Sequence, residues 1–182
     1  MSLIEDIRAG SEDPLLEQLA RAERTDAASL AARIVAGTVV VPLNSHRRDR
    51  VRPCAVGEGL RTKVNANIGT SETASDISLE LEKLRAAVDA GADSVMDLST
   101  DAELVRTREA VIAECPVIFG TVPVYEAAVR AVDEHGGITS MTPESMLDAV
   151  RRQAAEGADF QTIHAGLTRD VLDTVRDSER VT

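Results

Sequence analysis

The sequence predicts an α/β protein built around a parallel sheet, and three observations indicate this class. Four short strand-like runs begin near Thr62, Ser94, Val117 and Phe160. A helical pattern separates each run from the next, which is the arrangement that right-handed βα units produce. The tripeptide Gly-Ala-Asp joins a helix to a strand twice, at 91–93 and at 157–159. We therefore expect about four βα units.

The composition is that of a globular protein with one main domain and appendages. The chain has 182 residues, of which 43% are hydrophobic, enough to bury a core. Its net charge of −11 argues against a polyanionic partner. Only 2% of the residues are aromatic, which leaves little surface for stacking nucleic acid bases. We therefore expect no nucleic acid partner.

The cysteines and the N-terminal residues bear on location. Cys54 and Cys115 are too few for a disulfide framework and too far apart for the close ligand pairs of a metal site. They are interpreted as reduced cytosolic thiols. Residues 1–10 carry charges among the apolar side chains, and no apolar run approaches the length of about 18 residues that a span requires. The sequence thus predicts a cytoplasmic protein without a membrane partner.

Residues 1–60 are predicted to form a preamble of helices and a strand. Asp13 is followed by a proline and then by leucines, a pattern typical of a helix N-cap. Asp26 begins an alanine-rich helix that Gly37 ends, and the β-branched run 38–41 follows it as a strand.

The basic stretch 46–50 contains three arginines, one histidine and one aspartate. Charged runs usually form solvated surface, so we interpret this stretch as a solvated connection and assign no function to it. From residue 61 the alternation of strand and helix becomes regular. We therefore place a second domain at 61–182.

Within this second domain, the apolar patterns and turn residues predict each element in order. Strands are expected at 62–68, 94–98, 117–119 and 160–164. Helices are expected from Ser75 or Asp76 to Gly91, over 104–112, over 124–135, and from Thr142 to Gly157. The apolar faces of the last two helices are expected to contain Val129, Val132, Met146, Leu147 and Val150.

The loop after the first of these strands favours a barrel over a doubly wound nucleotide-binding sheet. Residues 67–71 contain a single glycine, whereas a dinucleotide site would carry a glycine-rich loop here. A closed eight-stranded barrel takes roughly 200 to 250 residues. Residues 61–182 can supply only part of one, so the predicted fold is a partial (β/α) barrel after a helical and strand preamble.

In parallel α/β folds, ligands are bound by side chains at the carboxyl ends of the strands. That rule selects Asn65, Asn67, Met96, Asp97, Tyr125 and His164. Each also has a purely structural interpretation: the asparagines can satisfy loop backbone, Met96 can fill the core, and Asp97 can brace its loop. Tyr125 can expose its hydroxyl to water, and His164 can be a satisfied core histidine. Their convergence at one end of the sheet favours a binding site.

No catalytic residue and no metal ligand set is predicted. Neither cysteine lies beside a histidine, and Ser99 has no Gly-x-Ser-x-Gly elbow around it. Clustered metal ligands are also missing from the sequence.

Four ordered motifs, at 59–71, 96–100, 120–125 and 162–166, together resemble those of the phosphomethylpyrimidine synthase family. The preamble resembles the family as well, at 37–44, and the resemblance covers roughly the first half of a family member. One departure is Asp101-Ala102, where the family usually has glycines. This departure predicts a differently shaped loop after the second strand and affects the expected Met96 contact.

The resemblance implies conversion of aminoimidazole ribotide to hydroxymethylpyrimidine phosphate in thiamine biosynthesis. The family uses S-adenosylmethionine cleaved at a [4Fe–4S] cluster, and it also binds zinc. Asn67, Met96, Tyr125 and His164 match the family's substrate contacts. The three polar side chains would orient the ribotide and Met96 would pack on it, while Asn65 and Asp97 would support their neighbours.

The resemblance also implies that this chain is incomplete as a catalyst. The family's zinc histidines and its cysteine cluster would follow Thr182, and two cysteines cannot supply the three thiolates of the cluster. We expect the chain alone to bind no cluster, S-adenosylmethionine or zinc, and to be inactive. A half-barrel has unpaired sheet edges, so a complementary C-terminal half or self-association is expected.

Two alternatives remain open at this point. The chain could be a noncatalytic ribonucleotide-binding or interaction module. It could also belong to the sister hydroxybenzimidazole synthase activity, which acts on the same ribotide.

Overall fold

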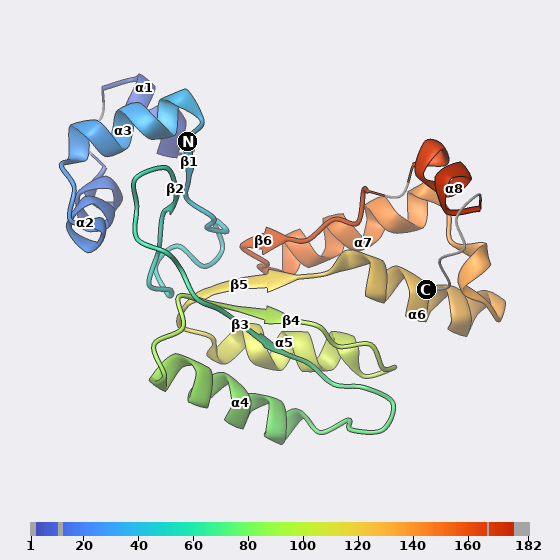
Figure 1. Cartoon of the computed structure of the whole chain (residues 1–182). Coiled ribbons are helices and arrows are strands. Elements are labelled where there is room, and N and C mark those ends of the chain that lie inside the picture. Colours follow the sequence, from blue (N-terminus) through green and yellow to red (C-terminus); the bar gives the residue numbers. More distant parts are fainter. Residues whose placement is uncertain (1–2, 11–12, 167, 177–182) are drawn as a thin grey trace.

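The computed structural model describes residues 3–10, 13–166 and 168–176. Three short helices and a small antiparallel strand pair come first, and a four-stranded parallel sheet with its helices follows (Figure 1). The N-terminal elements are α1 (Leu3–Arg8), α2 (Pro14–Glu23), α3 (Ala27–Ala36), β1 (Val39–Val40) and β2 (Val56–Gly57). Within the described residues, no helix is long and apolar enough to cross a bilayer.

Helices α2 and α3 begin at the capping residues that the sequence predicts, and α3 also ends at the predicted glycine. The carboxylate of Asp13 accepts a hydrogen bond from the Leu15 N–H at 2.9 Å, and Asp26 accepts one from Ser29 at 2.7 Å. Gly37 ends α3 in the left-handed conformation, with φ of 77°. The predicted strand shortens to the two residues of β1, and α1 and β2 were not predicted because such short elements carry too little periodicity.

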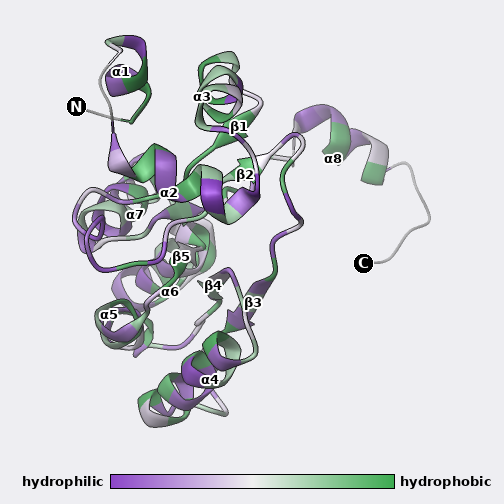
Figure 2. Cartoon of the chain, turned by 90° about the vertical axis from the view of Figure 1, so that its left-hand side faces the viewer, coloured by the Kyte–Doolittle hydropathy of each residue, from purple (hydrophilic) through white to green (hydrophobic). Residues whose placement is uncertain are grey.

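The parallel sheet confirms the predicted α/β class. Its strands run in the order β3 (Asn65–Ile68), β4 (Ser94–Asp97), β5 (Ile118–Thr121) and β6 (Phe160–Gln161). The helices of this region are α4 (Ile77–Asp89), α5 (Leu104–Glu114), α6 (Pro123–His135), α7 (Pro143–Glu156) and α8 (Arg169–Arg176), with a 3₁₀ turn, η1 (Ile138–Ser140), after α6. Figure 2 shows α4, α5 and α7 beside the strands β3, β4 and β5. The arrangement is consistent with a partial (β/α) barrel.

The main core lies between the sheet and the helices on its outer side. It contains Ile68, Leu84, Val95, Val111, Ile112, Cys115, Val117 and Phe119. Because side chains alternate along a strand, the neighbours of Ile68 and Val95 in β3 and β4 point to the opposite, inner face of the sheet. The sheet is therefore apolar on its helix side and free to carry polar groups on the other.

The repeated Gly-Ala-Asp joint has one structural basis in both places. The Asp93 N–H donates to the Val64 carbonyl at 2.9 Å while its carboxylate accepts from the Val64 N–H at 2.9 Å. Asp159 makes the same two contacts with Phe119, both at 2.8 Å. Each aspartate also pairs with an arginine, Asp93 with Arg61 and Asp159 with Arg47. The repeat thus fixes the start of a strand against its neighbour.

The interpretation of 46–50 as a solvated connection is wrong for Arg47. This side chain is buried, pairs with Asp159, and donates to the Cys115 carbonyl at 2.7 Å and the Val117 carbonyl at 3.1 Å. Its neighbours in the stretch are exposed. A charge run does not reveal which of its cations is buried, because burial depends on acceptors distant in the sequence.

Two of the predicted apolar contacts are also wrong. Val132 and Leu147 are 47% and 51% exposed. The buried side of α6 and α7 instead carries a polar pair, since Gln153 donates to the buried Glu126 carboxylate at 2.9 Å. Arg108 also donates to Glu126 at 2.9 Å. An apolar-stripe pattern cannot find a helix interface whose centre is an ion pair.

Candidate functional site

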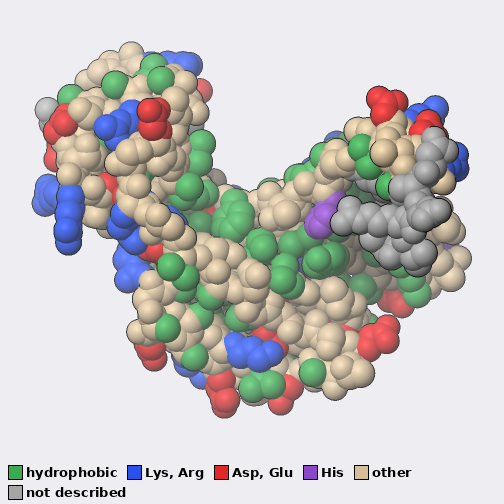
Figure 3. Space-filling model, viewed as in Figure 1, with side chains coloured by type: hydrophobic (Ala, Val, Ile, Leu, Met, Phe, Trp, Pro, Cys, Tyr) green, Lys and Arg blue, Asp and Glu red, His purple; other side chains and the backbone are tan. Residues whose placement is uncertain are grey.

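The inner face of the sheet brings Asn67 and Met96 together. Asn67 pairs in register with Met96 across β3 and β4, and Met96 pairs with Gly120 across β4 and β5. Paired residues in a parallel sheet point to the same face. Hydrophobic side chains gather over this hollowed side of the molecule, with a histidine at its edge (Figure 3).

The asparagines of β3 form a short hydrogen-bonded ladder on this face. The Asn65 amide donates to the Asn67 carbonyl oxygen at 2.9 Å, and the Ser94 hydroxyl donates to the Asn65 carbonyl oxygen at 2.7 Å. This ladder orients Asn67 and leaves its NH₂ group without a partner among the described residues. Asn65 is thus hydrogen-bonded to Asn67, which is the contact that a supporting neighbour would make.

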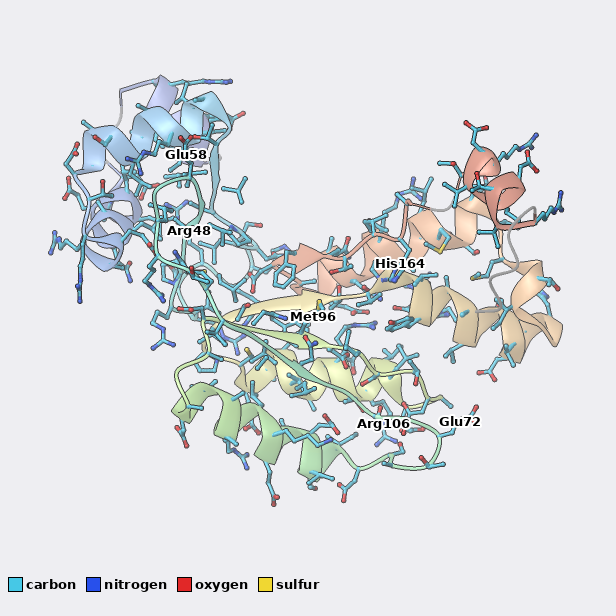
Figure 4. The ribbon with its side chains drawn as sticks, in the orientation of Figure 1. Arg48, Glu58, Glu72, Met96, Arg106 and His164 are labelled. Atoms are coloured by element: carbon cyan, nitrogen blue, oxygen red, sulfur yellow. The ribbon has the colours of Figure 1, made fainter. Side chains whose placement is uncertain are left out.

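The other two candidate residues, Tyr125 and His164, lie next to each other. Tyr125 lies in the first turn of α6, half-buried, and its ring centroid is 6.0 Å from that of the exposed His164. The predicted fourth strand, 160–164, ends earlier, at Gln161, so His164 stands on the loop after β6. The Thr162 hydroxyl on the same loop contacts the Met96 sulfur at 3.4 Å. Figure 4 shows Met96 and His164 along the same side of the sheet.

Gly120 of β5 leaves room for the ring of Phe160 to pack on the inner face of the sheet. A side chain at Gly120 would place its Cβ 2.2 Å from that ring. Phe160 packs with Ile118 and with Val51 from the N-terminal region. The inner face is thus apolar toward β6 and polar toward β3.

Asp97 points to the helix side of the sheet and braces its loop, as its structural interpretation predicts. Its carboxylate accepts from the Ser99 N–H at 2.9 Å and from the Ser99 hydroxyl at 2.5 Å. Burial raises the pKa of Asp97 above its usual value, although the two bonds from Ser99 act in the opposite direction. Asp97 does not contact Met96 across the sheet, because the two side chains alternate.

Two acids, Glu80 and Asp101, help to hold the loops after β3 and β4, and the sequence analysis assigned no structural role to either. The Gly69 N–H donates to Glu80 of α4 at 2.7 Å, the Thr70 N–H donates to the Ser99 hydroxyl at 3.0 Å, and the Thr70 hydroxyl donates to Asp101 at 2.7 Å. Glu80 left no signal, because one acid on a helix usually faces water. Asp101 did leave one, as a departure from a glycine motif.

Asp101 adopts no special backbone conformation. Among the described residues, Arg24 is the non-glycine with a positive φ, so Asp101 does not need the left-handed region. The loop after β4 is therefore open to a side chain, and that side chain is buried.

The cysteines of this chain do not fit an iron–sulfur cluster. Cys54 and Cys115 are both buried, and they pack in separate apolar clusters. Burial raises the pKa of both thiols, which disfavours the thiolate that binds metal. In the part of the chain that the structure describes, no group of three or more histidine, cysteine or acidic side chains could hold a metal ion.

The fold defines a protein of parallel βα units, and the candidate residues Asn67, Met96, Tyr125 and His164 lie at or after the ends of its four strands in turn. The chain belongs to the radical SAM ThiC family, whose model matches residues 2–182. This confirms the family resemblance drawn from the four motifs.

Three curated relatives illustrate the similarity. A phosphomethylpyrimidine synthase of Moorella thermoacetica is 42% identical over 181 residues, covering 100% of this chain and 42% of the relative. One of Desulforudis audaxviator is 47% identical over 173 residues, covering 95% of this chain and 40% of the relative. The 5-hydroxybenzimidazole synthase BzaB of Moorella thermoacetica is 42% identical over 182 residues, covering 100% of this chain and 42% of the relative. The chain thus spans less than half the length of these relatives.

Proposed function

We propose that this chain forms one wall of the substrate site of a phosphomethylpyrimidine synthase, with aminoimidazole ribotide as the substrate. The observation that supports this most is the pairing of the four motif residues. Asn67 and Met96 are neighbours in register, and the rings of Tyr125 and His164 are in contact. All four belong to a chain whose relatives include synthases of this name.

Each of these side chains has a role that its chemistry supports. The free NH₂ group of Asn67, the Tyr125 hydroxyl and the His164 imidazole can donate or accept hydrogen bonds to the polar edges of a ribotide. Met96 offers a polarisable thioether against which a flat heterocycle can pack. These groups bind and orient, and none of them is assigned a bond-breaking step.

Family membership supports S-adenosylmethionine and an iron–sulfur cluster as the cofactors of the complete enzyme. When bound, they supply the radical chemistry that protein side chains lack. Because the two cysteines here are buried and separate, we propose that the cluster and zinc ligands are provided by polypeptide outside this chain. A complementary C-terminal half is the proposed partner. The cytoplasmic location stays a prediction.

We also propose a division into a region of residues 1–60 and a region of residues 61–182. The first has its own apolar cluster, around Leu19, Leu30 and Ile34. The second has the sheet core. A small cluster around Val51 connects the two.

Calorimetric titration of the chain with aminoimidazole ribotide tests the proposed wall. His164→Ala should weaken binding about tenfold or more, since a lost hydrogen bond to a charged or buried group is worth about 1.5 to 3 kcal/mol. His135→Ala is the matched control, because His135 lies at the exposed end of α6 and should leave binding unchanged. Undetectable ribotide binding, or equal effects of the two substitutions, would contradict the proposal.

The sister activity is the second candidate, because a 5-hydroxybenzimidazole synthase is also among the relatives of this chain, at 42% identity. The two activities are distinguished by their products. The chain is mixed with the C-terminal portion of the Moorella thermoacetica phosphomethylpyrimidine synthase, ribotide, S-adenosylmethionine and a reductant. Hydroxymethylpyrimidine phosphate is the expected product, and a benzimidazole would favour the sister activity. Ribotide binding without any product in a folded mixture would favour a noncatalytic binding module.

A further inference from the structure

Tyr125 and Glu126 are neighbours in the first turn of α6, and their side chains leave the helix in different directions. Successive residues of an α-helix are rotated by about 100° around its axis. The Tyr125 ring lies beside that of His164, whereas the Glu126 side chain is buried and meets donors from α5 and α7. The rotation of α6 about its own axis therefore sets the positions of both side chains together.

The Glu126 carboxylate joins α6 to the helices on either side of it. Its Oε2 accepts from Arg108 of α5 and from Gln153 of α7, both at 2.9 Å. Its Oε1 accepts from Arg130 of α6 at 3.0 Å and from Arg152 of α7 at 2.9 Å. Burial acts to raise the pKa of Glu126, but the hydrogen bond from Gln153 and the charge of Arg108 outweigh this effect, so the pKa lies below its usual value. The group is therefore an anion at neutral pH, with two donors on each oxygen.

No described side chain caps the N-terminus of α6. Val122 occupies the N-cap position without a side-chain hydrogen bond. In α4 and α7, by contrast, Asp76 and Thr142 cap the first turn through their side chains. The first turn of α6 is held instead by Glu126, whose negative charge also suits the positive end of the helix dipole. Glu126 thus anchors the same turn that carries Tyr125.

A hydrogen-bonded anion fixes a helix more narrowly than apolar packing does. Hydrogen bonds are directional, so a small rotation of α6 would lengthen or bend several of the bonds to Glu126 at once. Buried polar networks in which the charged group is fully satisfied make the surrounding structure rigid and specify one arrangement. The cluster around Glu126 therefore restricts the rotation of α6, and with it the direction of the Tyr125 hydroxyl.

We propose that Glu126 is a positioning residue of the substrate site, which holds α6 in the rotation that places Tyr125 beside His164. Glu126 does not touch the ligand, and its effect on binding passes through the Tyr125 hydroxyl. This role rests on the proposed ribotide site, but the positioning itself can be measured without ribotide.

Tyrosine fluorescence measures the positioning directly, because Tyr125 is the only tyrosine of the sequence and there is no tryptophan. Glu126→Gln keeps the size of the side chain but turns an NH₂ group toward the donors of Arg108 or of Arg130 and Arg152. It should lower the anisotropy of the tyrosine emission of the folded protein and increase its quenching by acrylamide. Unchanged anisotropy and quenching in Glu126→Gln would overturn the proposal.

Asp93→Asn is the matched control for this measurement. It makes the same change from acid to amide in another buried acid that pairs with an arginine. Asp93 directly precedes β4, so it lies at the opposite end of the sheet from Tyr125, which follows β5. The tyrosine emission of folded Asp93→Asn should equal that of the wild type. Equal changes in the two variants would show a general loosening of the fold and would contradict positioning by Glu126.

Gln153→Met keeps the test decisive if Glu126→Gln does not fold. It removes one donor to Glu126, and it also removes a buried oxygen, Oε1 of Gln153, that has no hydrogen-bond partner among the described residues. The variant should therefore fold. Its tyrosine anisotropy should fall and its quenching should rise, as in Glu126→Gln but by a smaller amount. Emission identical to that of the wild type would contradict the proposal.

Titration with aminoimidazole ribotide separates this role from the proposed function. Glu126→Gln should weaken binding about fivefold to tenfold, the change that one lost hydrogen bond produces. In a Tyr125→Phe background the same substitution should have little further effect, because the hydroxyl that Glu126 positions is absent. An equal loss in both backgrounds would show that Glu126 does not act through Tyr125. A Tyr125→Phe protein that binds ribotide as tightly as the wild type would contradict the proposed function, whereas the fluorescence comparison decides the positioning by itself.

Discussion

Arg47 and Arg48 are adjacent arginines in opposite environments. The Arg47 side chain is buried with Asp159 and two backbone carbonyls, whereas the Arg48 side chain is 39% exposed and pairs with Asp13 at the surface. Removing one partner of a buried pair leaves an uncompensated charge, while an exposed pair contributes little. Alanine substitutions at these two adjacent positions therefore compare a buried ion pair with an exposed one.

Arg47→Ala should lower the free energy of unfolding by about 3 to 5 kcal/mol, because the buried Asp159 carboxylate loses its cationic partner and the carbonyls of Cys115 and Val117 each lose a hydrogen bond. Arg48→Ala should lower it by less than about 1 kcal/mol. Urea unfolding followed by circular dichroism measures both. Similar losses in the two variants would show that the burial of Arg47 has no energetic consequence.

Asp93 should make the free energy of unfolding depend on pH in the acidic range. Burial acts to raise its pKa, but hydrogen bonds from Arg61 and the Val64 N–H outweigh this effect, so the pKa of Asp93 lies below its usual value. When the pKa of a carboxyl group is lower in the folded protein than in the unfolded chain, the group stabilises the fold. This stabilisation is fully present above the pKa in the unfolded chain, about 3.9, and it is lost as the pH falls through the pKa in the folded protein.

Unfolding free energies measured from pH 6 to pH 2.5 check this expectation. Asp93→Asn should be less stable than the wild type at pH 6, and the difference should shrink as the pH falls below the usual aspartate range. Asp148→Asn, at an exposed position on α7, is the control and should show little pH dependence. A difference between Asp93→Asn and the wild type that stays constant with pH would refute the expected linkage.

At the residue scale, the strand-end rule selected the four motif residues and Asn65, but not the buried polar side chains of the helices. Asn67 and Met96 could be predicted to be close, since parallel strands align their carboxyl ends. The burial of Glu80 and Gln153 could not be predicted, because their polar groups bind partners that only the tertiary fold brings to them. Burial of a polar side chain is a property of the packed chain and leaves no period in the sequence.

At the scale of elements, Gly69 sets the distance between the first two site loops. It has φ of 148°, and a Cβ there would lie 2.6 Å from the Leu98 carbonyl carbon and from the Ser99 nitrogen. Both contacts are with backbone, so neither can move without shifting β4. The close approach of the loops after β3 and β4 therefore requires glycine at this position.

Gly69→Ala should destabilise the protein by more than about 1 kcal/mol, since it adds both backbone strain and a steric clash. Gly137→Ala is the control, because Gly137 is extended and a Cβ there would meet only Thr139 at 3.7 Å. Thermal unfolding compares the two variants. A Gly69→Ala protein as stable as Gly137→Ala would mean that the loops separate freely.

The elements themselves were predicted where capping residues mark them. Asp76 begins α4 by accepting from the Ser78 N–H at 2.8 Å, and Thr142 begins α7 with a capping box that Ser145 completes. Strand lengths were predicted less well, because β6 ends at Gln161 while the apolar pattern continues to Ile163, which is 52% exposed. A strand ends where its hydrogen bonds to the neighbouring strand end, and this point cannot be located from the sequence of the strand alone.

For the whole molecule, the four-stranded sheet has β3 and β6 at its edges. The inner face carries exposed groups such as Asn67, and in the described chain no strand pairs with the outer edge of β6. Unpaired edges and uncovered faces promote association. The architecture was predictable from the spacing of the βα units. The polypeptide that covers the sheet edges was not predictable, because its contacts are not encoded in the periodicity of this chain.

We expect the isolated chain to self-associate or to bind a complementary polypeptide that covers these edges. Light scattering over a range of protein concentrations should show a mass above that of one 19.4 kDa chain, rising with concentration. Adding the C-terminal portion of a relative should replace the larger species with a defined complex. A stable monomer at all concentrations would contradict this expectation.

The burial of Arg47 also sets an order of events during synthesis. On a chain that leaves the ribosome N-terminus first, Arg47 emerges well before Cys115 and Val117, and Asp159 follows it by 112 residues. Until Asp159 has been translated, the guanidinium must stay in water or find other acceptors. The connection between the N-terminal helices and the sheet can therefore close only after the residue that precedes β6 has been made, which couples its closure to the arrival of β6.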